Sequence, residues 1–496
     1  MYGVFFIVNS DRTLKVSVKI KNAVARIPDL RFREAINLTI YSGQHWAFLG
    51  PNGGGKTLLS DFMTGKIALH SGSVDYPLKE GNTPVYKYIK SVAFRDVYGM
   101  SDYKQMYYQQ RWNSSDIDNS PLAGELIKDL ATADEIKELF SFFNIEELLE
   151  KQVILFSSGE LRKFLIARTM LEKPRILILD NPYIGLDDSS RKLFNDFLAK
   201  TAEQNRVQII LLLCNVSDIP FFITDVLPVR DRKLLPPLKL ETFLEDKIVQ
   251  EKLFPVYQEK ISLPQALESA NTSYDSVLKM ENIHIRYGKR TILKDLNWQI
   301  LKGGKWALLG PNGSGKSTLL SLVYADNPQA YANVLYLFDK KRGSGESIWD
   351  IKKHIGYVSP EIHLYYQVEQ TALDVVGSGL FDSIGLYRKC NGNQLQEALK
   401  WMEVFHISHL KNHSFLKMSS GEQRLVILAR AFVKNPDLLI LDEPLHGLDQ
   451  SNKTLVSSII NLYCEQENKA LIYVTHYRNE IPRCVENRLE LTKIEG

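Results

Sequence analysis

The sequence predicts an α/β fold that is built twice, each time around a largely parallel sheet. Strand-like apolar runs alternate with helical patterns along most of the chain. The stretch GPNGGGKT at Gly50–Thr57 returns as GPNGSGKS at Gly310–Ser317, and the two lysines are 316 − 56 = 260 residues apart. The run LILD recurs as well, with its aspartates 442 − 180 = 262 residues apart. A period of this length indicates a duplicated domain and not a solenoid of short repeats.

Length and composition indicate a soluble globular chain. The 496 residues suffice for two to four domains, and an apolar content of 44% with a net charge of +3 is ordinary. No stretch reaches the roughly 18–20 apolar residues of a membrane-spanning helix, and no basic region precedes the N-terminal apolar run as in a signal peptide. The cysteines form no CxxC pair, which favours reduced thiols over a disulfide or metal site. We therefore expect a cytoplasmic protein.

The repeat predicts three parts: a first domain at 1–229, a linker at 230–276 and a second domain at 277–496. The stretch from Arg230 to Ala270 contains four prolines, and its seven Lys and Arg residues balance seven Asp and Glu residues. We expect a charge-neutral linker with some helix in it, packed on the body of the protein.

The two glycine-rich motifs predict phosphate cradles of P-loop NTPase domains. Each motif follows a strand-like run, WAFLG or WALLG, and opens a helical pattern, which is the context that GxxxxGK[ST] requires. The glycines allow backbone N–H groups to surround a phosphate at the positive end of a helix. The predicted ATP-binding residues are Gly50, Asn52, Gly53, Gly55, Lys56 and Thr57 in the first copy, and Gly310, Asn312, Gly313, Gly315, Lys316, Ser317 and Thr318 in the second.

The LILD runs predict the second half of a magnesium site. Each run has the composition of a buried strand, and Asp180 or Asp442 ends it. A carboxylate at that position, together with the hydroxyl of Thr57 or Ser317, would hold the Mg²⁺ that accompanies ATP.

A third motif makes a family resemblance visible. SSGE precedes the helical runs LRKFLIARTM and QRLVILARAF, so the chain resembles the ATP-binding cassette (ABC) ATPases, whose signature is commonly LSGGQ. The resemblance implies two tandem ABC nucleotide-binding domains, each with a helical signature subdomain, that close head to tail within one chain. Each ATP would then lie between the cradle of one domain and the signature of the other. The signature residues are Ser157, Ser158 and Gly159, and Ser419, Ser420 and Gly421.

The resemblance also implies that the two sites differ in chemistry. Glu443 matches the general base of the family and His476 matches its switch histidine. The first copy carries Asn181 after LILD, and we align Asn215 with the histidine. An amide cannot accept a proton near pH 7. We therefore predict that the first site is degenerate and the second hydrolyses ATP. In the alternative, Asn181 positions water adequately and both sites turn over.

Tyr287 is a candidate for stacking on adenine. It lies 316 − 287 = 29 residues before the second cradle lysine, where the family has an aromatic residue, whereas the same count in the first copy gives Ile27. In the alternative, Tyr287 is an ordinary strand tyrosine.

The tandem layout and the stretch RGSGESIWDIKKHIGYVSPEIHLYY at 342–366 resemble the ModF-type ATP-binding proteins, named for molybdate transport. That resemblance implies an ATP-binding subunit that docks on a membrane permease, peripheral at the inner face of the cell membrane. Two alternatives remain: a ribosome-associated translation factor of the ABC-F type, and a non-transport ATP-dependent sensor or remodelling protein. Aromatic and basic residues alternate at 86–112, which favours a docking groove over single-stranded nucleic acid.

Overall fold

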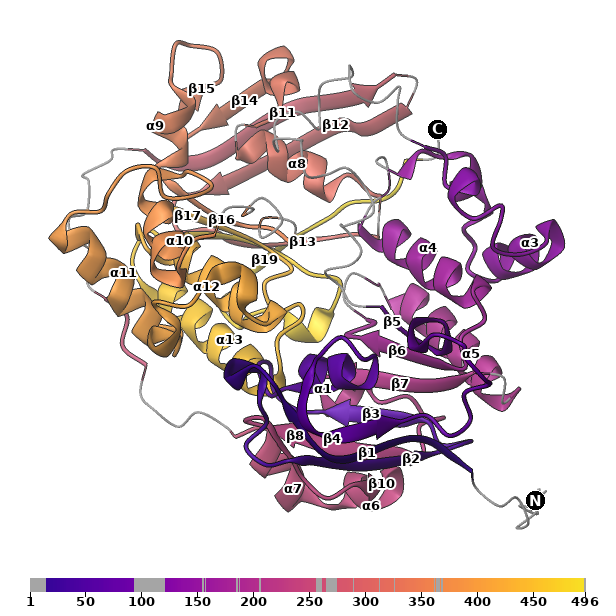
Figure 1. Ribbon diagram of the computed structural model, residues 1–496. Coiled ribbons are helices and arrows are strands. Elements are labelled where there is room, and N and C mark those ends of the chain that lie inside the picture. The colour runs from indigo at the N-terminus through magenta and orange to yellow at the C-terminus, as the bar shows by residue number, and fades with distance from the viewer. Residues whose placement is uncertain are drawn as a thin grey trace, which may run out of the picture. The chain divides into compact units, whose positions relative to one another are not determined.

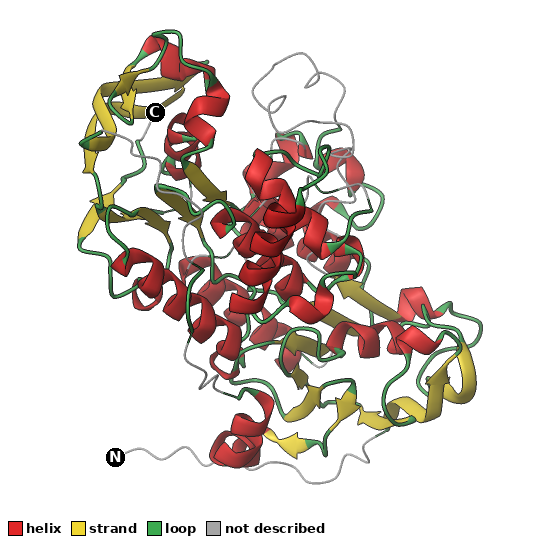
Figure 2. Ribbon diagram, turned by 90° about the vertical axis from the view of Figure 1, so that its left-hand side faces the viewer, coloured by secondary structure: helices red, strands yellow, loops and turns green. Residues whose placement is uncertain are grey.

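The computed structural model describes residues 15–92, 121–153, 156, 158–183, 186, 188–204, 207–255, 261–264, 274–288, 290–311, 313–324, 326–360, 362, 366 and 369–494 (Figure 1). The chain divides into two compact units. Unit 1 comprises 1–97, 121–183 and 193–253, and unit 2 comprises 98–120, 184–192 and 254–496. Helices and strands both occur throughout the described residues (Figure 2), so the predicted α/β class is confirmed.

Unit 1 is built on a seven-stranded sheet whose central strands run parallel. Its order is β10 (Leu238–Lys239), β8 (Asp225–Arg230), β3 (Trp46–Leu49), β7 (Gln208–Leu213), β6 (Ile176–Asp180) and β5 (Ile89–Val92), with β9 (Lys233–Leu234) paired to β8. A second, antiparallel sheet has the order β2 (Ile36–Tyr41), β1 (Val16–Ala25) and β4 (Leu69–Asp75). The helices are α1 (Lys56–Met63), α2 (Val85–Tyr88), α3 (Ala133–Phe142), α4 (Ser158–Leu171), α5 (Asp188–Glu203), α6 (Leu240–Glu245) and α7 (Lys247–Leu253), and the first residues of α5 belong to unit 2.

Unit 2 repeats this plan. Its parallel sheet has the order β16 (Ile355–Val358), β17 (Leu438–Asp442), β18 (Ala470–Val474), β13 (Lys305–Leu309) and β19 (Asn487–Glu490). The antiparallel sheet has the order β12 (Arg290–Leu301), β11 (Ser276–Tyr287), β14 (Val334–Leu337) and β15 (Lys340–Lys341). The helices are α8 (Lys316–Val323), α9 (Ile348–Lys352), α10 (Ala372–Ser378), α11 (Gly392–Val404), α12 (Ser420–Phe432) and α13 (Gln450–Glu465); Figure 1 shows α10, α11 and α12 in orange beside β16 and β17.

Alternate residues of β17 face two different cores. Leu439 and Leu441 pack with the helices α10 to α13. Leu438 and Ile440 pack on the other face, with α8 and the antiparallel sheet. Both faces of the strand are therefore apolar, as expected for a buried parallel strand. Because side chains alternate with a period of two, Asp442 follows Ile440 onto the face that α8 covers.

The predicted linker is partly folded into unit 1. β10 pairs with β8, and Phe243 and Leu253 are fully buried. The division into three parts at residues 230 and 276 remains a prediction. By their contacts, residues 193–253 belong to unit 1 and residues 254–496 belong to unit 2. No helix in the described part of the chain is long and apolar enough to cross a membrane.

Candidate ATP-binding and hydrolysis site

The first glycine-rich loop joins β3 to α1 and ends in a left-handed turn. Gly55 caps the helix with φ 106°, a conformation that favours glycine. The Nζ atom of Lys56 donates to the carbonyl oxygens of Gly50 and Pro51, at 2.8 Å each. The ammonium group is therefore held over the loop, where a phosphate group could replace the carbonyl oxygens as its partner.

The second loop has the same geometry in unit 2. Gly315 caps α8 with φ 94°. The Nζ atom of Lys316 lies 2.7 Å from the carbonyl oxygen of Gly310 and 2.9 Å from that of Pro311. Asn312 lies outside the described residues. The two loops thus share the same capping conformation and the same lysine contacts, as expected from their common motif.

The first glycine of each motif is required by a close approach of the backbone. A Cβ atom on Gly50 would lie 1.8 Å from the carbonyl oxygen of Val229, at the end of β8. A Cβ atom on Gly310 would lie 2.5 Å from that of Leu491, just after β19. The backbone at the first glycine of each cradle therefore lies in close contact with the end of the neighbouring strand.

The proposed magnesium ligands of unit 1 lie together. The Oγ1 atom of Thr57 donates to Oδ2 of Asp180 at 2.6 Å. Asp180 and Asp442 are buried at the ends of β6 and β17, while Ser317 lies in the first turn of α8. Hydroxyl and carboxylate oxygens are the hard ligands that Mg²⁺ prefers, so these residues fit the ion that accompanies ATP.

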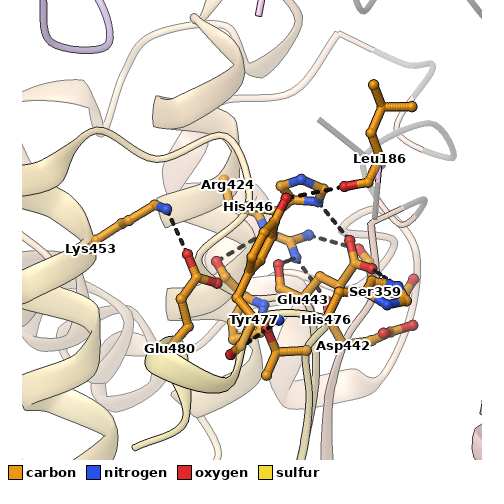
Figure 3. A network of polar contacts seen from close by, with 12 residues as sticks. Leu186, Ser359, Arg424, Asp442, Glu443, His446, Lys453, His476, Tyr477 and Glu480 are labelled. Carbon is orange, nitrogen blue, oxygen red and sulfur yellow. Dashed lines mark hydrogen bonds and ion pairs between the residues drawn. The ribbon is translucent and has the colours of Figure 1, made fainter. Parts of the chain in front are cut away.

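Glu443 lies directly after β17, between two imidazoles (Figure 3). Its Oε2 atom is 2.6 Å from Nδ1 of His446, and its Oε1 atom is 2.9 Å from Nε2 of His476. Since an ionised carboxylate only accepts hydrogen bonds, Nδ1 of His446 and Nε2 of His476 carry the protons. Both oxygens of the candidate base therefore have a donor in this structure.

The two histidines also set the acidity of Glu443. Burial alone would raise the pKa of its carboxyl group. The charge and the hydrogen bond of His446, followed by those of His476, outweigh burial and hold the pKa well below its usual value. The two imidazoles thus favour the ionised form of Glu443, which is the form that can accept a proton.

Arg424 fixes the backbone around this carboxylate. Its guanidinium group, on α12, donates to the carbonyl oxygens of Ser359, Asp442 and Glu443 at 2.9, 2.9 and 2.5 Å (Figure 3). Burial lowers the pKa of Arg424 to about 10, although Glu443 and Asp442 act in the opposite direction. Arg424 therefore remains a cation at neutral pH and ties α12 to the ends of β16 and β17.

Unit 1 carries different groups at the equivalent positions. Asn181 follows β6, and its Nδ2 atom donates to Oδ1 of Asp180 at 3.1 Å.

The alignment of Asn215 with His476 is corrected by the strand register. Asp180 pairs with Leu212 and Asp442 pairs with Val474, so the offset of 262 residues places Cys214 opposite His476. Asn215 lies one residue later, where Nδ2 donates to Oδ2 of Asp218 at 3.2 Å. The equivalent position in unit 1 still has no imidazole.

The signature of unit 2 begins α12 with a capping box. The Oγ and backbone N atoms of Ser419 donate to Oε2 of Glu422 at 2.6 and 2.8 Å, and the backbone N–H of Glu422 donates back to Oγ at 3.4 Å. Ser420 and the buried Gly421 form the first turn of the helix.

The signature of unit 1 is described only in part. Ser157 lies outside the described residues, and of Ser158 and Gly159 the structure describes only the backbone, at the start of α4. Glu160 pairs with Nζ of Lys151 at 2.9 Å.

Tyr287 is the last residue of β11. Its side chain is half-buried, and its hydroxyl accepts a hydrogen bond from Nδ2 of Asn327 at 3.0 Å. Burial raises its pKa, while the bond from Asn327 lowers it. Ile27 is 55% exposed in unit 1. Stacking of adenine on Tyr287 remains a prediction.

Comparison with known proteins agrees with this geometry. The model of the family described as "ABC transporter" matches residues 34–184 and 293–446, more than half of the chain. The chain belongs to the ABC transporter family. Members of its ATP-binding branch are ATPases, so the enzyme class that the motifs predict is confirmed.

Several relatives extend over almost the whole chain. The ABC transporter ATP-binding protein ModF of Escherichia coli (strain K12) is 35% identical over 487 residues, which cover 97% of this chain and 98% of ModF. The predicted resemblance to the ModF-type tandem cassettes is thereby confirmed. An uncharacterized ABC transporter ATP-binding protein of Schizosaccharomyces pombe is 28% identical and covers 95% of this chain and 97% of its own.

A solved structure shares the fold of this ABC chain. An archaeal ribosome recycling factor, crystallised with an archaeal ribosomal stalk protein, superposes with a TM-score of 0.54. The superposition covers 95% of this chain and 87% of that one at 17% identity. At that level of identity the likeness supports the tandem ABC fold alone.

Sequence reasoning missed two residues of the site. His446 was visible in principle, because LHGLD has a histidine where YIGLD has Ile184. Arg424 was visible as a cation within the apolar helical run QRLVILARAF. The sequence gives no signal for the partners of these two side chains, since those partners depend on the turn after β17.

Proposed function

We propose that this chain binds ATP at both cradles and hydrolyses it mainly at the site built on unit 2. The observation that carries the proposal is the carboxylate of Glu443, held between two imidazoles at the end of β17. The equivalent position of unit 1 holds the amide of Asn181, which cannot take up a proton.

In the proposed reaction, Lys316 and the backbone N–H groups of the second loop bind the phosphates of ATP. Mg²⁺ held by Ser317 and Asp442 would neutralise charge on the phosphate oxygens. Glu443 takes the proton of a water molecule whose oxygen attacks the γ-phosphorus. The bond from the γ-phosphorus to the bridging oxygen breaks, and ADP and inorganic phosphate form. His476 is proposed to contact the γ-phosphate.

The first cradle is proposed to bind ATP without consuming it. The groups that a nucleotide with Mg²⁺ needs are present in Lys56, Thr57 and Asp180. The position of the general base is occupied by the amide of Asn181. The family resemblance also predicts that the signature of one domain covers the nucleotide bound at the cradle of the other, and this remains a prediction.

A single-turnover experiment tests the asymmetry directly. Protein is mixed with radiolabelled ATP, chased with unlabelled ATP, and quenched at intervals, and the ADP and ATP bound per chain are counted. We expect one bound ATP per chain to become ADP quickly while the other persists. Conversion of two ATP per chain at the same rate would refute the proposal.

For the biological role, we propose an ATP-binding subunit of an importer, molybdate-type by its likeness to ModF. Such a subunit would work in the cytoplasm, bound to a membrane permease. The second candidate is a ribosome-associated factor. It is suggested by the fold that this chain shares with the archaeal ribosome recycling factor. Against it, the region between the domains has no basic excess.

Affinity purification of the Glu443→Gln chain with ATP separates these roles. The substitution should prolong the ATP-bound state, and wild-type protein with ADP is the control. Co-purification of a membrane permease supports the importer, and ribosomes support the second candidate. Soluble proteins alone would support a third role, an ATP-dependent sensor or remodelling protein.

A further inference from the structure

We infer that His446 is a positioning residue for Glu443, which holds one carboxylate oxygen in place while the other oxygen accepts the proton of water. This inference rests on the proposed function, because it assigns a task to a neighbour of the proposed base. His446 itself is not expected to touch ATP.

The contact between His446 and Glu443 is short and shielded. The two side chains are each 15% exposed, and the distance from Nδ1 to Oε2 is 2.6 Å. A hydrogen bond to a charged acceptor in such surroundings is stronger than one in water. It restricts rotation of the carboxylate, which a long glutamate side chain otherwise permits at little energetic cost.

The local backbone brings these two side chains together. Glu443 has φ 49°, in the left-handed region, and its carbonyl oxygen accepts the backbone N–H of His446 at 3.1 Å. The tight turn places the imidazole beside the carboxylate three residues earlier. Arg424 fixes the same turn through the carbonyl oxygens of Asp442 and Glu443. The pair therefore belongs to a rigid segment.

The two imidazoles are suited to different tasks. His476 binds Oε1 at 2.9 Å and is the residue proposed to turn to the γ-phosphate. When it does so, Oε1 becomes available to water, while His446 still holds Oε2. A base fixed at one oxygen presents the other in a constant direction, and a displacement of about 1 Å can cost roughly 10²-fold in rate.

The first copy of the sequence repeat lacks all three groups of this arrangement. At the positions equivalent to Glu443, His446 and His476 it has Asn181, Ile184 and Cys214. The histidine at 446 thus occurs together with the base, as expected if it acts through that base.

The test compares His446→Ile, which introduces the residue of the first sequence repeat, with His446→Asn, whose Nδ2 donor lies near the place of Nδ1. We expect His446→Ile to lower kcat roughly tenfold, with KM for ATP changed less than about twofold, because geometry and not binding is lost. His446→Asn should retain at least about a third of wild-type kcat, since it keeps a donor. If the isoleucine variant does not fold, His446→Ala replaces it with the same expectation.

A double-substitution cycle with Glu443→Gln decides whether His446 acts through the base. In that background His446→Ile should lower turnover by less than about twofold further, because non-additivity marks residues that act as one unit. A wild-type kcat for His446→Ile, an asparagine variant as slow as the isoleucine one, or losses that multiply would each overturn the inference. If Glu443→Gln itself leaves turnover unchanged, the proposed base is wrong, and that failure is distinct from a failure of His446.

Discussion

The ends of β6 and β17 have the same backbone and different chemistry. Asn181 and Glu443 both lie in the left-handed region, with φ 47° and 49°. Their backbone N–H groups donate to equivalent carbonyl oxygens, of Leu212 at 3.0 Å and of Val474 at 2.9 Å. Yet the first side chain donates an amide hydrogen to Asp180, and the second accepts from two imidazoles.

This comparison shows that the turn does not depend on the side chain that it presents. Its geometry follows from two buried parallel strands and their register, which the apolar runs of both units specify. The catalytic group can therefore be lost from one copy without loss of the fold. A degenerate site that still folds and binds nucleotide is the expected result of such a duplication.

The largest expected effect concerns the proposed base. Glu443→Gln should lower steady-state ATP hydrolysis by about 10²–10⁴-fold, the usual contribution of a positioned general base. The amide keeps the shape of the side chain but cannot accept the proton. Phosphate release per chain, measured at saturating ATP, gives the ratio to wild type.

The matched control for that change lies at the equivalent turn of unit 1. Asn181→Ala should change turnover by less than about threefold, because no proton is transferred there. A loss under threefold for Glu443→Gln, or equal losses for both variants, would contradict the asymmetry.

Restoring the missing groups to the first site should produce a gain of function. In a Glu443→Gln background, Asn181→Glu with Cys214→His should raise turnover roughly tenfold, since base and imidazole return to the first site. Single-turnover conversion of bound ATP measures the gain.

Asn181→Glu with Asn215→His is the control for this gain, and it should stay at the background level. The strand register places Cys214, and not Asn215, opposite His476. Equal gains from the two designs would show that the register argument is wrong.

A smaller effect is expected from the first cradle. Lys56→Ala should weaken binding of one nucleotide per chain and slow hydrolysis at the second site roughly fivefold, the lower end of usual coupling between sites. Equilibrium binding of a fluorescent ATP analogue gives the stoichiometry. Lys316→Ala is the matched variant and should abolish hydrolysis. If Lys56→Ala leaves both binding and rate unchanged, the first cradle is not a working nucleotide site.

The sequence was sufficient for the strands, cradles and paired aspartates, because each has a local pattern. The buried strand β6, the capping glycine Gly55 and the contact from Thr57 to Asp180 all lie where the motifs predict them. The alignment of Asn215 was one residue off, although the offset of 262 residues between Asp180 and Asp442 already points to Cys214. The strand register of β7 and β18 confirms that offset.

Two further features depend on tertiary structure. His446 reaches Glu443 only because the turn has a positive φ, and no spacing rule predicts that contact. The segment with α6 and α7 was expected to pack on the body of the protein, and the structure adds that it packs on unit 1, where Phe243 and Leu253 are buried.

The smallest expected effect concerns the helix that follows the signature of unit 2. Glu422→Ala removes the acceptor of the capping box that begins α12 and should destabilise unit 2 by about 1 kcal/mol, the usual contribution of a helix cap. Its melting temperature should then fall by about 2–4 °C. Scanning calorimetry of this variant beside wild type, with and without ATP, measures the shift, and an unchanged melting temperature would show that the capping box does not stabilise α12.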